Sequence, residues 1–264
     1  MTAAQRVKKL IWSVLLTKMG FNWKLNSNVS IQIRDYGDWV IYNEIFVDQE
    51  YDKAIQAAIE AQLSHGDPFQ VIDLGANVGF FSLRFCDQAI KAGIHPNRIR
   101  LLAVEADGRC LETLPRRLNC LTELGVHLKV VQGLVGKRSG IANFSMGRES
   151  FSSYVADDTG DGTTEMNDSM AYIDVEKQLD HDCQIVLIKC DIEGSEFDFI
   201  PNYSSLLEKT MYFAIEYHLK NGSIADAESI LAASGLKQPK LLSDSELYPT
   251  YFYTSSPAVS GANQ

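Results

Sequence analysis

From about residue 70 onward, hydrophobic and polar residues form a regularly alternating pattern. Short, nearly continuous apolar runs alternate with stretches of helical spacing, which is typical of a parallel sheet covered by helices on both faces. The predicted strands are residues 71–74, 100–105, 128–132, 185–190 and 212–216. The predicted helices are residues 79–92, 107–124, 195–208 and 223–234, and Pro115 should break the second one. The pattern therefore predicts an α/β fold.

Residues 1–66 are expected to form an N-terminal extension. A first helix is predicted from the helical spacing of five apolar residues, namely Val7, Leu10, Ile11, Val14 and Leu15. Two short strands, 29–33 and 39–42, should then form a hairpin across Gly37-Asp38. Asp48 is expected to cap a further helix that ends before Gly66. The apolar face predicted for this helix is Tyr51, Ala54, Ile55, Ala58, Ile59 and Leu63.

The rest of the chain, residues 67–254, is predicted to be a single α/β domain. Residues 236–242 and 247–254 should form an antiparallel pair that closes the sheet edge. Residues 147–174 are rich in Ser, Gly, Asp and Thr, which indicates a lid-like surface insertion. Residues 255–264 are expected to be a flexible tail.

Charge and composition narrow the classes of partner. The chain has 24 basic and 34 acidic residues, a net charge of −10, which disfavours nucleic acid and anionic membrane surfaces. No apolar run reaches the roughly 18 residues of a membrane span. Five cysteines without C-x-x-C spacing favour a reduced, cytoplasmic setting. Nothing in the pattern indicates an oligomeric state.

The clearest local motif is the run from Val71 to Gly79, in which a buried strand enters a glycine turn and opens a helix. Gly75 permits a close backbone approach, and Gly79 lets the helix start against the sheet. The spacing is G-x-x-x-G, whereas dinucleotide-binding proteins normally have G-x-G-x-x-G. Asp73 would repel a diphosphate and suits a cationic amino-acid group.

The next strand ends at Glu105, beside the glycine turn in this class of sheet. A carboxylate there can accept two hydrogen bonds from the vicinal hydroxyls of a ribose. Five more titratable residues follow the fourth and fifth strands, namely Asp191, Glu193, Glu196, Glu216 and His218. Glu196 should lie in the first turn of a helix, where the dipole favours a carboxylate. The others indicate a functional crevice at the carboxyl edge of the sheet.

These motifs together resemble the FkbM family of S-adenosylmethionine-dependent methyltransferases. The matching segments are 71–79, 103–107, 188–196 and 216–218, preceded by 44–51. The resemblance implies a class I methyltransferase fold, a Rossmann-like, mostly parallel seven-stranded sheet whose last strand is antiparallel. It also implies that S-adenosylmethionine is bordered by Asp73, Gly75, Ala76, Asn77, Gly79, Glu105, Ala106 and Asp191. Asn77 stands where many class I enzymes have glycine.

The resemblance favours O-methylation of a small molecule or sugar, with N-methylation as the nearest rival. His218 is the natural general base for a hydroxyl, although Asp191 or Glu193 could take that role. A divalent cation held by Asp191, Glu216 and His218 is a third possibility. A nucleotide-dependent oxidoreductase and a non-catalytic cofactor-binding module remain as alternatives from other classes.

Overall fold

The structure, a computed structural model, describes residues 20–145, 154–155 and 167–255, and its centre is a seven-stranded sheet. The strand order is β11-β12-β10-β9-β3-β4-β5. The strands are β3 (Phe69–Leu74), β4 (Ile99–Glu105), β5 (His127–Gln132), β9 (Gln184–Cys190), β10 (Thr210–Glu216), β11 (Leu236–Ser243) and β12 (Thr250–Ser255). β12 is antiparallel to both neighbours, and the other adjacent pairs are parallel. This order and direction confirm the class I methyltransferase fold.

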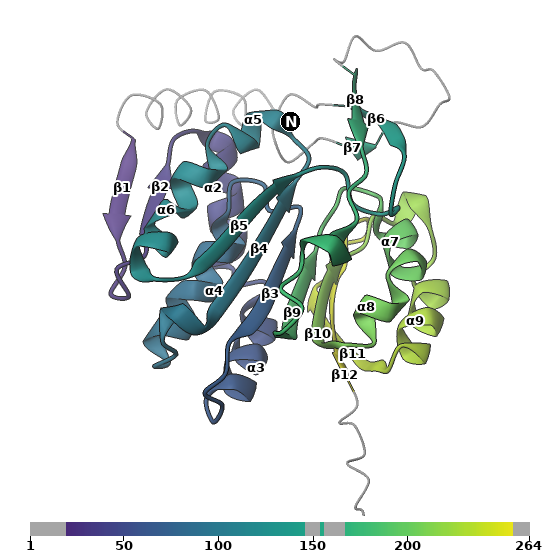
Figure 1. Cartoon of the computed structure of the whole chain (residues 1–264). Helices are drawn as coiled ribbons and strands as arrows, with labels where there is room; N and C mark the ends of the chain where they lie inside the picture. The colour runs from purple at the N-terminus through teal and green to yellow at the C-terminus, as the bar shows by residue number, and fades with distance from the viewer. Residues whose placement is uncertain (1–19, 146–153, 156–166, 256–264) are drawn as a thin grey trace, which may run out of the picture.

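Helices cover both faces of the sheet (Figure 1). On one face lie α3 (Asp52–Gln62), α4 (Phe80–Lys91) and α6 (Leu114–Leu124), and on the other α7 (Glu196–Asn202), α8 (Ser204–Leu207) and α9 (Ile224–Ala233). Alternate residues of the central strands enter two separate cores. Val71 and Leu101 pack in one core, whereas Ile72 and Leu102 pack in the other. The central strands β3, β4 and β9 are mainly apolar because both of their faces are buried.

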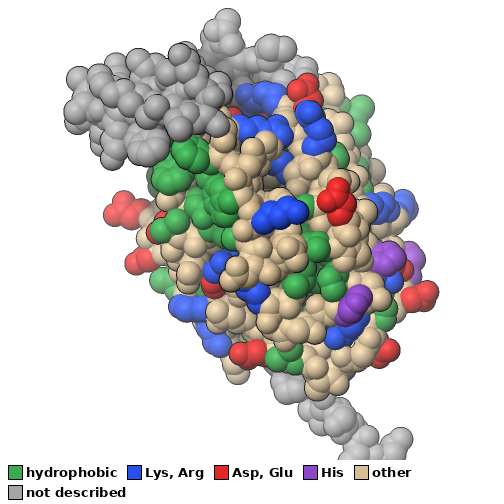
Figure 2. Space-filling model, turned by 90° about the vertical axis from the view of Figure 1, so that its left-hand side faces the viewer, with side chains coloured by type: hydrophobic (Ala, Val, Ile, Leu, Met, Phe, Trp, Pro, Cys, Tyr) green, Lys and Arg blue, Asp and Glu red, His purple; other side chains and the backbone are tan. Residues whose placement is uncertain are grey.

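The N-terminal hairpin differs from the prediction. β1 (Phe21–Lys24) pairs with β2 (Ser30–Ile33), whereas residues 39–42 belong to helix α2 (Tyr36–Tyr42). The predicted strand at 39–42 and the turn at Gly37-Asp38 are therefore wrong. The reason is a helix cap, because the Asp35 side chain accepts a hydrogen bond from the Asp38 backbone N–H. Figure 2 shows the side of the molecule that carries this hairpin, with Lys and Arg side chains spread over it.

Helix α3 also begins later than predicted. Asp48 ends the preceding π-helix η1 (Asn43–Val47), and Tyr51 occupies the N-cap position of α3. The predicted apolar face is confirmed at Ala54, Ile55, Ala58 and Ile59, which are buried. Leu63, in contrast, is 52% exposed. The helix predicted over residues 7–15 lies outside the described residues.

Two other predicted helices are interrupted. As expected, Pro115 lies in the first turn of α6, after the short helix α5 (Gly108–Leu111). The helix predicted over 195–208 is instead divided at Tyr203, where φ is −120°. The Tyr203 hydroxyl donates a hydrogen bond to the Ile173 carbonyl oxygen over 3.0 Å, which ties this break to a neighbouring segment.

The remaining elements lie mainly around the sheet edges. β11 and β12 form the predicted antiparallel pair. β6 (Ile141–Ser145), β7 (Tyr154–Val155) and β8 (Asn167–Ala171) form a small separate sheet, and most of the predicted 147–174 lid lies outside the described residues. Short 3₁₀ turns are η2 (Pro96–Arg98), η4 (Val175–Gln178) and η5 (Leu219–Asn221). None of the helices in the described ranges combines the length and apolarity needed to cross a membrane.

Candidate functional site

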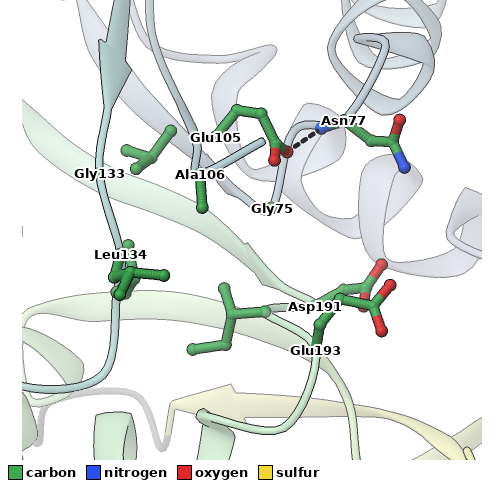
Figure 3. A pocket seen from close by; sticks show the side chains of 11 residues that line it. Gly75, Asn77, Glu105, Ala106, Gly133, Leu134, Asp191 and Glu193 are labelled. Atoms are coloured by element: carbon green, nitrogen blue, oxygen red, sulfur yellow. Dashed lines mark hydrogen bonds between the residues drawn. The ribbon is translucent and has the colours of Figure 1, made fainter. Parts of the chain in front are cut away.

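Two adjoining hollows lie where the carboxyl ends of β3, β4, β9 and β10 meet. We call the first the narrow cleft (Figure 3), and it is lined by Gly75, Asn77, Val104, Glu105, Ala106, Gly133, Leu134, Val135, Asp191, Ile192 and Glu193. The second, the large cavity, has a volume of about 570 Å³. Gly75, Asn77, Asp191 and Glu193 line both hollows, which are therefore direct neighbours.

The large cavity has both charged and apolar walls. Its ionisable lining residues are Glu44, Glu50, Tyr51, Lys189, Asp191, Glu193, Glu216, His218, Lys220 and Tyr248. Its other lining residues are Ile41, Ile45, Gly75, Ala76, Asn77, Phe80 and Phe81. This mixture of aromatic surface and convergent polar groups is typical of sites for small organic molecules.

The glycine turn after β3 brings two strand ends into direct contact. Gly75 has φ of +71°, and a Cβ atom on it would lie 1.7 Å from the Asp191 carbonyl oxygen. Gly79 has φ of +88°, and a Cβ atom there would lie 2.8 Å from Leu118 Cδ2. Both glycines therefore serve close approaches, as the motif predicts, and neither position tolerates a side chain without movement of its neighbours.

Glu105 braces the turn from β4. Its Oε2 accepts the Asn77 backbone N–H at 2.6 Å, drawn in Figure 3, and its Oε1 accepts the Asp107 backbone N–H at 2.7 Å. Burial raises the pKa of Glu105 to about 7, although these two hydrogen bonds oppose the rise. Each carboxylate oxygen keeps a lone pair for a further donor in the narrow cleft. Glu105 is thus placed to accept hydrogen bonds from a ligand.

Asp73 lies behind the glycine turn and lines neither hollow. It is fully buried and accepts a hydrogen bond from Ser82 Oγ at 2.6 Å. Its Oδ1 lies 3.7 Å from Nζ of Lys189, the residue opposite it on β9. Burial raises the pKa of Asp73, whereas Lys189 lowers it. Asp73 therefore faces the ammonium group of Lys189 and is not in a position to contact a ligand directly.

Lys189 links the buried Asp73 to the large cavity. Its ammonium donates a hydrogen bond to the Gly75 carbonyl oxygen at 2.7 Å and lies 3.3 Å from Asp191 Oδ2. Burial disfavours its charge, but Asp191 and Asp73 outweigh this effect and raise the pKa of Lys189. Sequence reasoning missed this residue, although it lies two positions before Asp191 in the same motif. The signal was a lysine within the apolar, buried run from Ile185 to Cys190.

His218 lies between carboxylates. Its Nδ1 is 3.0 Å from Glu196 Oε1, and its Nε2 is 3.2 Å from Glu193 Oε2. Burial disfavours the charged ring, but these two carboxylates prevail and raise the pKa of His218 to about 11. The ring is therefore an imidazolium at neutral pH. In that state it has no lone pair with which to act as a general base.

Glu196 does more than complement a helix dipole. The residue is completely buried, and its Oε1 accepts the backbone N–H groups of Ile192 and Gly194, each at 3.1 Å, besides facing His218. The loop that it holds contains Glu193 at φ of +55°. Glu196 thus fixes both this strained loop and the histidine ring.

Three carboxylates on other elements complete the large cavity. Burial raises the pKa of Glu216 to about 9, with Asp191 adding to the rise. Removal from bulk water raises the pKa of Glu44 to about 7, with Glu50 as the next cause. Burial also raises the pKa of Glu50, which accepts a hydrogen bond from Thr250 Oγ1. Glu44 and Glu50 were not predicted as site residues, because they come from the N-terminal region.

The structure brings most of the predicted residues together. Asp191, Glu193, Glu216 and His218 all line the large cavity, Ala76 lies beside them, and Ala106 lines the narrow cleft. Figure 3 shows the carboxylates of Asp191 and Glu193 pointing the same way, away from Leu134. Gly79, like Asp73, lines neither hollow.

A metal-ligand geometry also exists here among the described residues. Single ligand atoms of Asp191, Glu196 and His218 lie within 4.8 Å of one another. However, Glu196 is already paired with the His218 ring, and Asp191 is paired with Lys189. The positive charge that a cation would supply is therefore provided by the protein.

Comparison with known proteins finds solved structures that are similar to this chain. No family model matches the sequence, and no curated protein matches it. A methyltransferase FkbM from Methylobacillus flagellatus KT is similar, with 16% identity, a TM-score of 0.49, and coverage of 95% of this chain and 60% of that one. Magnesium protoporphyrin IX methyltransferase from Synechocystis PCC 6803, solved with bound SAM, has 12% identity, a TM-score of 0.45, and coverage of 94% and 97%. Precorrin-6y C5,15-methyltransferase from Geobacter metallireducens GS-15 has 11% identity, a TM-score of 0.43, and coverage of 78% and 88%.

Proposed function

We propose that this protein is an S-adenosylmethionine-dependent methyltransferase that acts on a hydroxyl of a small molecule. The observation that carries the proposal is the shared wall of the two hollows, formed by Gly75, Asn77, Asp191 and Glu193. Group transfer requires two ligands in contact, with the reacting atoms aligned. A cofactor in the narrow cleft and an acceptor in the large cavity would meet at this wall.

The residues that line the narrow cleft have the chemical character that the cofactor requires. Val104, Leu134 and Ile192 provide an apolar surface for an adenine ring, and Glu105 offers its remaining lone pairs to the ribose hydroxyls. Asp191, at the shared wall, is placed to attract the cationic aminoacyl end. When bound, S-adenosylmethionine supplies an activated methyl group on a sulfonium.

A base on the acceptor side of the site must take up the proton of the acceptor hydroxyl. As the acceptor oxygen gains the methyl group and the carbon–sulfur bond breaks, the hydroxyl proton has to pass to a base. Because His218 is protonated at neutral pH, we assign this role to Glu193, whose carboxylate lines both hollows and whose pKa is raised by burial. His218 holds Glu193 in place through the 3.2 Å contact.

Calorimetry with S-adenosylhomocysteine, the spent cofactor, tests the cofactor site. We expect binding to the wild-type protein, and Glu105→Ala should weaken it by about tenfold, since a hydrogen-bonded charged group contributes about 1.5 kcal/mol or more. His218→Ala should leave this affinity nearly unchanged and lower the turnover of methyl-labelled cofactor with hydroxylated acceptors. No uptake of cofactor or product by the wild type would refute the proposal.

The same calorimetry separates the rival classes. An oxidoreductase would bind a nicotinamide dinucleotide, for which we expect no heat. A non-catalytic module would bind S-adenosylhomocysteine but transfer no methyl group to hydroxyl or amine panels. The mass and fragmentation of any product distinguish O-methylation from N-methylation.

A further inference from the structure

The large cavity holds more acidic than basic groups. Among the described residues that line it, five are carboxylic acids and three are basic. Two of the basic residues are already partly neutralised by acidic residues that do not line the cavity. Lys189 faces Asp73, and His218 faces Glu196. Asp191 and Glu193 complete these two pairs from within the cavity. Glu44, Glu50 and Glu216 are therefore additional to these two pairs, although Glu216 Oε1 also lies 3.9 Å from His218 Nε2, which already faces two other carboxylates.

Carboxylates that are shielded from bulk water need either protons or a counter-charge. The raised pKa values of Glu216 and Glu44, about 9 and about 7, express this need, because burial and neighbouring carboxylates are their main causes. A cationic ligand in the cavity would supply the missing charge. It would also allow all three carboxylates to ionise.

The shape of the cavity favours an organic cation over a metal ion. Its volume of about 570 Å³ is in the range of sites for small organic molecules. Aromatic side chains of Tyr51, Phe80, Phe81 and Tyr248 line it, and aromatic faces attract organic ammonium groups. An organic ammonium ion can pack its carbon atoms against such aromatic walls, whereas a bare divalent metal ion requires oxygen ligands on all sides.

Resting on the proposed methyl transfer, we propose that the acceptor is an amino alcohol or amino sugar whose protonated amino group is bound by Glu44, Glu50 and Glu216. The ammonium group has no lone pair, so it is a recognition group that passes through the reaction unchanged. The methyl group goes to a hydroxyl of the same molecule near Glu193. Glu44, Glu50 and Glu216 are thus determinants of specificity.

Matched pairs of probes test the inference in calorimetry on the full chain saturated with S-adenosylhomocysteine. The pairs are glucosamine with N-acetylglucosamine and tyramine with N-acetyltyramine, in which acetylation removes the positive charge. We expect at least one amine to bind about tenfold more tightly than its acetylated partner, the equivalent of one partly shielded ion pair. Glu44→Gln and Glu216→Gln should each remove most of this preference.

Glu208→Gln is the matched control, because Glu208 is exposed and lines neither hollow. It removes the same charge, so it reports any general attraction of cations to a protein of net charge −10, and we expect it to keep the wild-type preference. Magnesium chloride provides a further arm, in which we expect no competition with the amine at equal concentration.

The outcomes separate the inference from the proposed function. Failure of S-adenosylhomocysteine to bind overturns the methyltransferase itself. Normal cofactor binding with equal affinities within each probe pair, or with no amine bound, overturns only the cationic acceptor. Displacement of the amine by magnesium, or an equal loss in Glu208→Gln and Glu44→Gln, also overturns it.

Discussion

The narrow cleft and the large cavity share a wall but are built in different ways. The narrow cleft is shaped largely by backbone, because the Gly75 N–H donates a hydrogen bond to the Val104 carbonyl oxygen of β4, and Gly75 lies close against the Asp191 carbonyl oxygen after β9. The large cavity is shaped by side chains from distant segments, including Glu44 before α3 and Tyr248 before β12. The sheet topology thus dictates the first hollow, whereas elements added around the sheet determine the second.

The largest expected effect tests the backbone origin of the narrow cleft. Gly75→Ala places a methyl group against the Asp191 carbonyl oxygen in a left-handed conformation. We expect a loss of about 3 kcal/mol in the free energy of unfolding and loss of S-adenosylhomocysteine binding. Denaturant unfolding and calorimetry measure the two.

Gly93→Ala is the control, since Gly93 has φ of +92° but nothing within 4 Å of its added Cβ atom. It carries the conformational cost alone, about 1 kcal/mol. Equal losses in the two variants would show that the contact between the strand ends is unimportant.

A second change tests whether one residue supports the large cavity independently of the narrow cleft. Glu196→Gln removes the charge that faces His218 and weakens the hold on the 191–194 loop. We expect a loss of about 2 kcal/mol in stability, because a buried charged hydrogen bond is lost. NMR titration should show a lowered pKa of His218, and turnover should fall while cofactor affinity changes by less than about threefold.

The matching variant Glu196→Asp keeps the charge on a shorter side chain. The pKa of His218 should therefore fall less in this variant than in Glu196→Gln. If Glu196→Gln weakened the binding of S-adenosylhomocysteine as strongly as Glu105→Ala does, the two hollows would not function independently of each other.

The smallest effect concerns pH. Glu216 has a pKa of about 9 in the folded protein against an ordinary value of 4.5, so the folded state retains a proton that the unfolded state has lost. Its contribution to stability is fully present below about pH 4.5 and is lost as the pH rises through 9. Glu216→Gln cannot lose a proton there, so its free energy of unfolding should fall less between pH 6 and pH 7 than that of the wild type, by about 1.4 kcal/mol, which is one pH unit of linkage.

Glu208→Gln should keep the wild-type pH dependence, because this side chain is exposed. Parallel pH profiles for the wild type and Glu216→Gln would mean that Glu216 is not buried among like charges.

The same contrast explains what the sequence could predict. The five central strands and the two glycines of the turn after β3 were predicted because local patterns encode them: continuous apolar runs, and glycine where the backbone bends. Residues 39–42 were wrongly predicted as a strand because their apolar side chains suit either structure, and the Asp35 cap decides for a helix. Glu44 and Glu50 were missed because only the tertiary packing of the N-terminal region brings them to the sheet edge.

Asp73 illustrates a further limit. Its position two residues before Gly75 indicated a ligand contact, yet the charge opposite it is that of Lys189. Lys189 comes 116 positions later in the sequence and pairs in register with Asp73 across β3 and β9. Likewise, the ordinary pKa of histidine suggested a base, whereas two carboxylates from the 193–196 segment keep His218 protonated. Such pairings depend on which side chains meet, and spacing along the chain does not reveal them.

The position of β12 has a consequence for how the protein is made. This strand follows every other strand in sequence, yet it inserts between β10 and β11, and Thr250 at its start bonds to Glu50, 200 residues earlier. During synthesis the ribosome releases β3, β4 and β9 well before β12, so the narrow cleft can assemble on the nascent chain first. The large cavity closes last, so the proposed cofactor site can form on a growing chain before the proposed acceptor site does.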